Sequence, residues 1–226
     1  MNKYAIIVAG GSGTRFGKGL PKQFRLLCGK PVLWWSMHRF HSEDPDTIII
    51  VVLPKDYISV WKEIIETLSP DERYQHIVVE GGDSRTRSVK NGLSAIENDA
   101  SYVAVHDGAR PLVSVEMIKR GWTAALNENG VVPAVPVTDS LRVISENEST
   151  AVDRSKFIAV QTPQIFPTSL LKEAYRNLGE GQFTDDASVV ESLGFKIGLY
   201  EGSHENIKVT NPGDIEVAEV LMKGKP

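Results

Sequence analysis

The chain has 226 residues, of which 41% are hydrophobic and 24% are charged, and its formal net charge is −4. This composition is typical of a globular protein with a substantial core, and the single cysteine, Cys28, excludes an internal disulfide and a thiolate metal cluster. Because no apolar stretch approaches the roughly 20 residues that span a bilayer, and the N-terminal apolar run is too short for a signal peptide, we expect a cytoplasmic protein outside the membrane.

Apolar runs and amphipathic stretches alternate along the chain, which predicts an α/β fold with a mostly parallel sheet covered by helices. In chain order, we predict strands at residues 5–8, 47–53, 76–80, 102–106, 130–135 and 196–200. We predict helices at residues 32–41, 58–68, 85–98, 115–127, 168–177, 186–193 and 213–222. No linker or internal repeat divides these elements, so we interpret residues 1–226 as one domain.

Residues 137–157 are the exception to this alternation, and we call them the arm. Residues 138–144 alternate like a short strand, residues 145–150 are a polar turn, and a second strand starts at Ala151. A hairpin is marginally stable alone and needs a partner surface. That surface belongs either to a second copy of the chain or to the hairpin's own domain.

A glycine-rich loop follows the first predicted strand, with glycines at positions 10, 11, 13 and 17. Such a loop lets backbone N–H groups converge on an anion, and Arg15 and Lys22 add the positive charge that a polyphosphate needs. The spacing fits neither a Walker loop nor the dinucleotide fingerprint. The alternative is a strand-to-helix turn that requires several glycines.

Basic residues gather in the same part of the chain. Residues 1–42 contain seven lysines and arginines and no acidic residue, although the whole chain is acidic. This distribution indicates a local site for a small polyanion. It does not indicate a nucleic-acid surface, which needs a basic face over a larger area.

Asp107 stands where the fourth predicted strand stops, and in open α/β sheets ligands bind beyond the carboxyl ends of the strands. One carboxylate is enough for Mg²⁺, which takes one or two of them together with phosphate oxygens and water. The alternative role for Asp107 is a turn or helix cap. Arg110, three residues later, is expected to pair with a carboxylate and brace the loop.

Three further segments contain candidate binding residues. Gly82, Asp83 and Ser88 surround a predicted helix start and could recognise a nucleobase, although Asp83 and Ser84 could also serve only as caps. Residues 184–188 are typical of an N-cap with acids in the first turn. Lys208 lies inside a short apolar stretch, where a lysine either meets an anion or extends from an edge strand into solvent.

Taken together, these segments resemble the 2-C-methyl-D-erythritol 4-phosphate cytidylyltransferases of the non-mevalonate isoprenoid pathway. The matching segments, in family order, are AGGSGTRFG, PKQF, GGDSRTRSV, VHDGARP, PVTDSL, VDR, QTPQIF, TDDASVVE and NIKVT. The resemblance covers nearly the whole chain and implies a Rossmann-like fold that transfers CMP from CTP to methylerythritol phosphate. Gly108 and Ser140 depart from the family's commoner alanine and threonine, and Ser140 keeps the hydroxyl.

The resemblance also implies a role for each matching residue. Catalysis falls to Arg15, Lys22 and Lys208, and Mg²⁺ binds at Asp107. CTP contacts Ala9, Gly10, Gly11, Gly13, Gly82, Asp83 and Ser88. The sugar phosphate contacts Ser140, Arg154 and Thr184. In this family the arm crosses to a second subunit, so we expect a homodimer in which Ser140 and Arg154 serve the partner's site.

The alternatives to this interpretation are a related cytidylyltransferase, an oxidoreductase and a non-catalytic binding protein. A ribitol-5-phosphate cytidylyltransferase has similar loop and lysine motifs, and the TDDAS and HDGARP segments favour the methylerythritol branch. An NAD-dependent oxidoreductase requires an acidic residue after the second strand, where this chain has Leu53, Pro54 and Lys55. A non-catalytic nucleotide-binding protein is disfavoured because Arg15, Lys22, Asp107 and Lys208 are all present.

Overall fold

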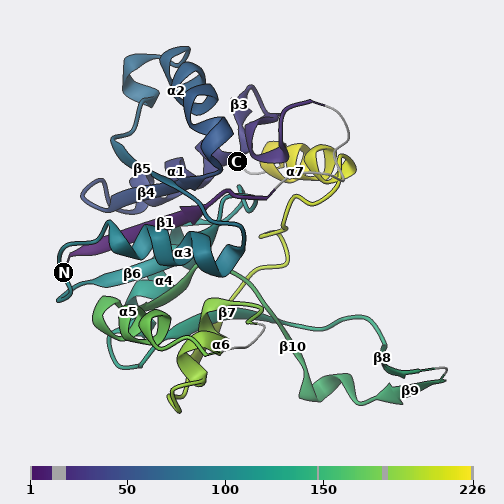
Figure 1. Cartoon of the computed structure of the whole chain (residues 1–226). Coiled ribbons are helices and arrows are strands. Elements are labelled where there is room, and N and C mark those ends of the chain that lie inside the picture. The colour runs from purple at the N-terminus through teal and green to yellow at the C-terminus, as the bar shows by residue number, and fades with distance from the viewer. Residues whose placement is uncertain (1, 12–18, 147, 180–182, 225–226) are drawn as a thin grey trace.

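An eight-stranded sheet forms the centre of the molecule (Figure 1). The structure is a computed structural model that describes residues 2–11, 19–146, 148–179 and 183–224. The strands follow the order β10-β7-β11-β6-β1-β4-β5, and β12 pairs with β7. Their bounds are β1 (Lys3–Val8), β4 (Ile48–Leu53), β5 (His76–Glu80), β6 (Tyr102–Asp107), β7 (Val131–Pro136), β10 (Ile158–Val160), β11 (Gln164–Pro167) and β12 (Gly198–Glu201).

In the parallel half of the sheet, strands β6, β1 and β4 are buried on both faces, whereas the edge strand β5 is only partly covered. In β1, Ala5 and Ile7 enter the core on one face, while Tyr4 and Ile6 enter the core on the other. The apolar run in β4 is buried from Ile49 onward, as its lack of alternation predicts. Strands β1, β4, β5 and β6 run parallel, so their carboxyl ends meet at one edge of the sheet.

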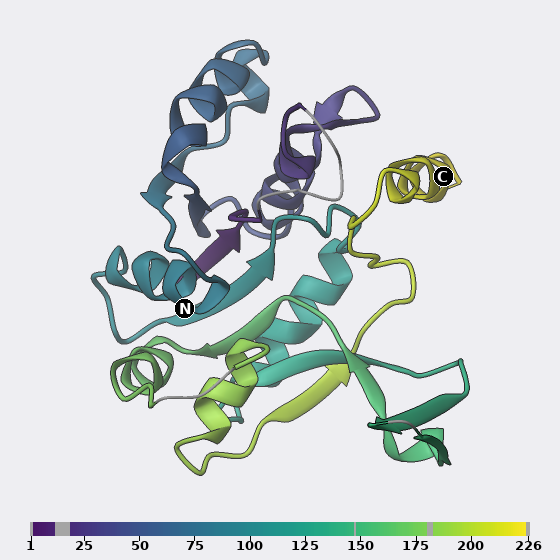
Figure 2. The same cartoon turned by 45° about the vertical axis from the view of Figure 1, so that its right-hand side comes forward.

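Helices cover both faces of this sheet (Figure 2). On one face lie α1 (Val32–Glu43), α2 (Ile58–Glu66) and α4 (Val115–Ala125), and their aromatic and methionine side chains pack on the strands in the larger core. On the other face lie α3 (Arg85–Ser94), α5 (Thr168–Arg176) and α6 (Asp186–Glu191). This arrangement confirms the predicted Rossmann-like α/β class, with a mostly parallel sheet flanked by helices.

Two predicted caps start helices at the site end of the sheet. The Ser84 hydroxyl accepts a hydrogen bond from the backbone N–H of Arg87, and Asp185 accepts one from the N–H of Ser188. Helix α3 ends at Ser94, earlier than predicted, and Ile96 still packs into the core from the loop that follows.

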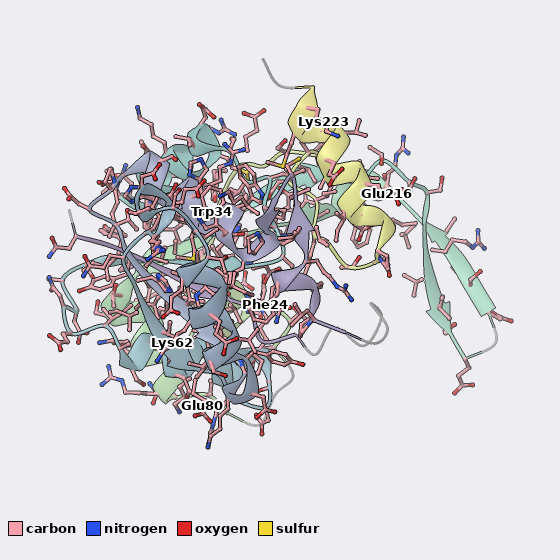
Figure 3. The ribbon with its side chains drawn as sticks, turned by 90° about the horizontal axis from the view of Figure 1, so that it is seen from above. Phe24, Trp34, Lys62, Glu80, Glu216 and Lys223 are labelled. Atoms are coloured by element: carbon pink, nitrogen blue, oxygen red, sulfur yellow. The ribbon has the colours of Figure 1, made fainter. Side chains whose placement is uncertain are left out.

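The last helix, α7 (Gly213–Lys223), lies beside the small hairpin of β2 (Leu26–Leu27) and β3 (Lys30–Pro31). Ala218 of α7 packs against Leu27, Val32 and Leu112 in a minor core. Figure 3 shows Glu216 and Lys223 along this helix, on the side of the molecule away from Lys62 in α2. None of the helices in the described ranges is long and apolar enough to cross a membrane.

The arm contains a separate hairpin of β8 (Leu141–Ser145) and β9 (Glu148–Val152), and it stands clear of the central sheet in Figure 1 and Figure 3. The predicted hairpin is therefore present, but the predicted polar turn over 145–150 is wrong. Residues 148–150 belong to the second strand, with Leu141 opposite Val152. Both faces of this ribbon are exposed, so polar residues are as compatible with strand pairing as apolar ones.

Candidate active site

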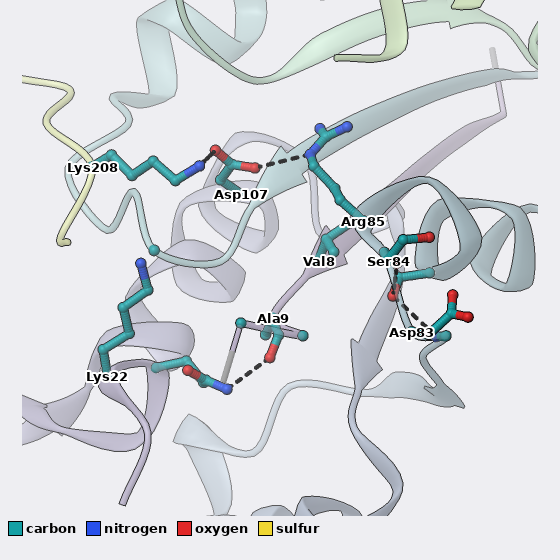
Figure 4. A pocket seen from close by; sticks show the side chains of 14 residues that line it. Val8, Ala9, Lys22, Asp83, Ser84, Arg85, Asp107 and Lys208 are labelled. Carbon is teal, nitrogen blue, oxygen red and sulfur yellow. Dashed lines mark hydrogen bonds and ion pairs between the residues drawn. The ribbon is translucent and has the colours of Figure 1, made fainter. Parts of the chain in front are cut away.

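A cavity of about 430 Å³ opens at the carboxyl ends of the parallel strands (Figure 4). We call it the first cavity. Five separate segments of the described chain line it, and three of them follow β1, β5 and β6, whose carboxyl ends lie at the same edge of the sheet. Its lining comprises Val8, Ala9, Gly10, Gly11, Lys22, Gln23, Gly82, Asp83, Ser84, Arg85, Ser88, Asp107, Ala109 and Lys208.

The chain leaves β1 along one wall of this cavity. The backbone N–H of Ala9 donates to the carbonyl of Val52, and the buried Gln23 amide donates to the carbonyl of Ala9 at 2.7 Å. These bonds fix the start of the glycine loop, so Ala9, Gly10 and Gly11 line the cavity as expected. The predicted Gly13 and Arg15 lie outside the described residues.

Lys22 reaches the cavity from the 3₁₀ turn that follows the loop (Figure 4). Its ammonium group donates to the carbonyl of Val209 at 2.8 Å. This bond ties the N-terminal segment to the segment that contains Lys208. Two lysines from opposite ends of the sequence therefore line the same cavity.

The loop after β5 forms the opposite wall, and Ser88 determines its shape. The Ser88 hydroxyl accepts from the N–H of Gly82 at 3.1 Å and donates to the carbonyl of Ser84 at 2.9 Å. A Cβ on Gly82 would come within 2.1 Å of the Arg87 side chain, so glycine is required there. Asp83 is exposed beside this wall, and the contact of all three predicted residues with a nucleobase stays a prediction.

Asp107 lies at the floor of the cavity among three cations. Its carboxylate contacts Lys208 Nζ at 2.7 Å, Arg85 Nε at 3.5 Å and Arg110 Nε at 3.7 Å. Burial opposes ionisation, but the charges of Arg85, Lys208 and Arg110 hold the pKa of Asp107 well below its usual range. Asp107 is therefore a fixed negative charge at neutral pH, and Arg110 braces its loop as predicted.

The donor set at this position fits Mg²⁺. No group of three or more histidine, cysteine or acidic side chains gathers anywhere in the described part of the chain. A metal held by Asp107 would therefore take its remaining ligands from phosphate oxygens and water, which is how Mg²⁺ is usually bound beside nucleotides. The assignment of Asp107 as a magnesium ligand stays a prediction.

A second cavity, of about 260 Å³, adjoins the first. It is lined by Thr184 and by residues of the loops around β11, and it shares Arg85, Asp107 and Lys208 with the first cavity. The predicted substrate residue Thr184 thus lies beside the predicted metal and lysine positions.

Ser140 and Arg154 lie at the base of the arm and line neither of these cavities. Arg154 donates to the carbonyl of Thr138 and lines a separate cavity with Phe157 and Ile158. Within one copy of the chain, the structure does not bring these two predicted residues to the site.

Sequence reasoning did not identify two of the lining residues, Gln23 and Arg85. Gln23 belongs to the quoted PKQF segment, and Arg85 belongs to GGDSRTRSV, but neither has a residue type or spacing that distinguishes it from a surface side chain. Their partners, the carbonyl of Ala9 and the carboxylate of Asp186, are distant in sequence, so only the folded chain identifies them.

A mostly parallel sheet with helices on both faces, whose strand ends present Gly10 and Gly11, two lysines and a buried aspartate in one cavity, is the arrangement of an α/β nucleotidyltransferase. The family model that matches this chain is IspD, 2-C-methyl-D-erythritol 4-phosphate cytidylyltransferase, over residues 4–224. The chain belongs to this family.

Named relatives agree with this assignment. The chain is 44% identical to the 2-C-methyl-D-erythritol 4-phosphate cytidylyltransferase of Bacteroides fragilis, over 98% of this chain and 100% of that protein. It is 45% identical to the protein of the same name from Porphyromonas gingivalis, over 97% of each. The crystal structure of the Thermus thermophilus cytidylyltransferase superposes with a TM-score of 0.76 at 32% identity, over 97% of this chain and 98% of that one.

Proposed function

We propose that the chain transfers CMP from CTP to 2-C-methyl-D-erythritol 4-phosphate and releases pyrophosphate. The product is 4-diphosphocytidyl-2-C-methyl-D-erythritol, a step in isoprenoid precursor synthesis. The observation that carries this function is the pair of adjoining cavities that share Asp107 and Lys208. A reaction between two phosphorylated substrates needs two sites that meet at a cluster of charges.

The first cavity has the properties of a nucleoside triphosphate site. Its volume of about 430 Å³ lies within the range of small-molecule pockets. The triphosphate would lie along Gly10 and Gly11 toward Lys22, with cytosine toward Gly82 and Asp83. We place Gly13 and Arg15 with the same triphosphate on the strength of the resemblance.

The second cavity suits the polyol phosphate. Thr184 offers a hydroxyl there, and Lys208 supplies positive charge at its boundary with the first cavity. Ser140 and Arg154 would complete this site from the arm of a partner subunit. The exposed arm residues Val143 and Ile144, 54% and 80% accessible, are consistent with a dimer that covers them.

The chemistry requires charge stabilisation more than proton transfer. The attacking group is an anionic phosphate oxygen, so no general base is needed. It forms a bond to the α-phosphorus of CTP while the bond to the β-phosphate oxygen breaks and its electron pair leaves with pyrophosphate. Lys22, Lys208 and Arg15 would counter the repulsion between the two anions and stabilise the transition state.

Asp107 would hold Mg²⁺, and a bound magnesium ion supplies additional positive charge to the phosphate oxygens. The ion pair between Asp107 and Lys208 keeps both side chains at the boundary of the two cavities before substrates enter. Residues 1–226 would act as one nucleotidyltransferase domain with an arm at residues 137–157.

This function is tested by incubating the chain with CTP, Mg²⁺ and methylerythritol phosphate and following both products by phosphorus NMR. We expect equal amounts of pyrophosphate and of a new diphosphodiester, and much slower product formation with ATP, GTP or UTP. Pyrophosphate that appears without the sugar phosphate would instead indicate hydrolysis of the nucleotide.

A further inference from the structure

Three side chains line both cavities in the described part of the chain: Asp107, Lys208 and Arg85. The first two have roles in the proposed function, and Arg85 has none. Arg85 begins helix α3, directly after its cap Ser84, and its side chain is 29% exposed. The transferred phosphorus must lie where the two cavities meet, so a cation at this position lies next to the reacting phosphates.

The guanidinium of Arg85 is held between two carboxylates. Its Nη2 donates to Oδ2 of Asp186 at 2.7 Å, and its Nε lies 3.5 Å from Oδ1 of Asp107. The remaining N–H groups of Arg85 have no protein partner among the described residues. They can therefore bond to an anionic ligand without giving up either carboxylate.

Asp186 is fully buried, and its contacts make it a rigid support. Its Oδ1 accepts from the Tyr175 hydroxyl at 2.6 Å, and its backbone N–H donates to the Gln164 side chain at 3.0 Å. A buried carboxylate is costly unless an opposite charge compensates it, and Arg85 is its ion-pair partner. The two charges therefore hold each other in place.

We propose that Arg85 is a further catalytic residue, whose guanidinium contacts the phosphates that react, and that Asp186 positions it. This role rests on the proposed function. Arg85 would act in the step in which the acceptor phosphate oxygen attacks the α-phosphorus and pyrophosphate leaves with the electron pair of the broken bond. The planar fork suits this position because its five N–H donors have fixed directions in one plane, so donors remain for a phosphate oxygen after two carboxylates are bonded, whereas an ammonium group has three donors in all.

The first test is Arg85→Ala, measured as kcat and KM for both substrates. We expect kcat to fall on the order of 10²-fold, with a smaller change in KM for CTP, because the contact strengthens in the transition state. Added guanidine at millimolar concentration should restore part of kcat, which a purely structural role would not explain. Arg176→Ala, an exposed arginine of α5, is the matched control and should leave kcat unchanged.

A second pair of variants covers the case in which Arg85→Ala does not fold. Arg85→Lys keeps a charge for Asp186 but loses the fork, and we expect at least a roughly 10-fold loss of kcat with little change in thermal stability. Asp186→Asn should lower kcat in the same way, and the double variant Arg85→Lys/Asp186→Asn should be no slower than the worse single variant.

The outcomes separate this inference from the proposed function. If the unmodified chain does not form the diphosphodiester, the proposed function fails and the role of Arg85 fails with it. If the unmodified chain is active and either Arg85 variant that folds keeps its kcat within about 3-fold, only the role of Arg85 is overturned. Failure of guanidine to restore a folded Arg85→Ala would also overturn it.

Discussion

Nζ of Lys208 lies 2.7 Å from Oδ2 of Asp107, at the boundary between the two cavities. Asp107 ends the buried strand β6, whereas the Lys208 side chain is 42% exposed. The carboxylate is thus fixed by the sheet, and the lysine can turn toward an arriving phosphate. The pair keeps charge at the reaction centre without leaving a buried carboxylate uncompensated.

Replacing Lys22 should impair turnover more than binding. We expect Lys22→Ala to lower kcat on the order of 10²-fold or more, which is the effect of losing one positioned charge donor. Lys62→Ala, on the exposed face of α2, is the control for loss of a lysine. Near-normal turnover of Lys22→Ala at saturating CTP would remove Lys22 from the catalytic set.

Removal of divalent metal should stop the reaction. We expect a chelator to abolish pyrophosphate release and Mg²⁺ to restore it. Asp107→Asn should require roughly 10-fold or more Mg²⁺ for its half-maximal rate, and calorimetry should show weaker binding of magnesium–CTP. The exposed Asp56→Asn is the matched control. An unchanged magnesium requirement in Asp107→Asn would contradict its assignment as the ligand.

If the arm serves the partner's site, mixing two inactive variants should restore enzymatic activity. In a mixed dimer of Lys22→Ala and Arg154→Ala, one site would have both intact residues and the other would have neither. Random exchange of subunits would then recover about a quarter of the unmodified rate. If Arg154 acts in its own subunit, or if the chain is a monomer, mixing the variants will give no recovery.

His76 should make stability depend on pH. Its Nε2 accepts from the Trp61 indole N–H at 3.0 Å, and its Nδ1 donates to the carbonyl of Tyr74 at 2.7 Å, so the bonded form is neutral. Burial lowers the pKa of His76 below its ordinary 6.5. The unfolded chain therefore binds this proton first as the pH falls, and the stabilisation present above pH 6.5 is lost between that value and the folded-state pKa.

Denaturant unfolding at a series of pH values measures this effect. The free energy of unfolding should decrease as the pH falls below about 6.5. In His76→Gln, the free energy of unfolding should decrease less over this pH range. Trp61→Phe, which removes the indole donor, should alter the pH dependence of the free energy of unfolding over the same range. A pH dependence identical in all three proteins would show that His76 does not contribute to it.

The elements that sequence predicts well are those whose signal is local. The continuous apolar run of β4, the serine cap of α3 and the acid at the end of β6 each depend on neighbouring residues. Strand β11 was not predicted, because it is short, ends in a proline and is held by antiparallel pairing with β6. The sequence cannot show which distant strand a short segment will join.

The same limit applies to the site. Asp107 and Lys208 were identified because a carboxylate at a strand end and a lysine in an apolar stretch are unusual by themselves. Arg85 is unremarkable in its own segment, and its anchor, Asp186, lies 101 residues away. An arginine becomes recognisable as part of a reaction centre only when folding brings its carboxylate partners to it.

The activity proposed for this chain is the transfer of CMP from CTP to methylerythritol phosphate. It is tested most directly by comparing kcat/KM for pyrophosphate release from CTP and Mg²⁺ with methylerythritol phosphate and with ribitol 5-phosphate, side by side. We predict efficient release with the first substrate and little with the second. Preference for ribitol 5-phosphate, or no release with either, would contradict the account.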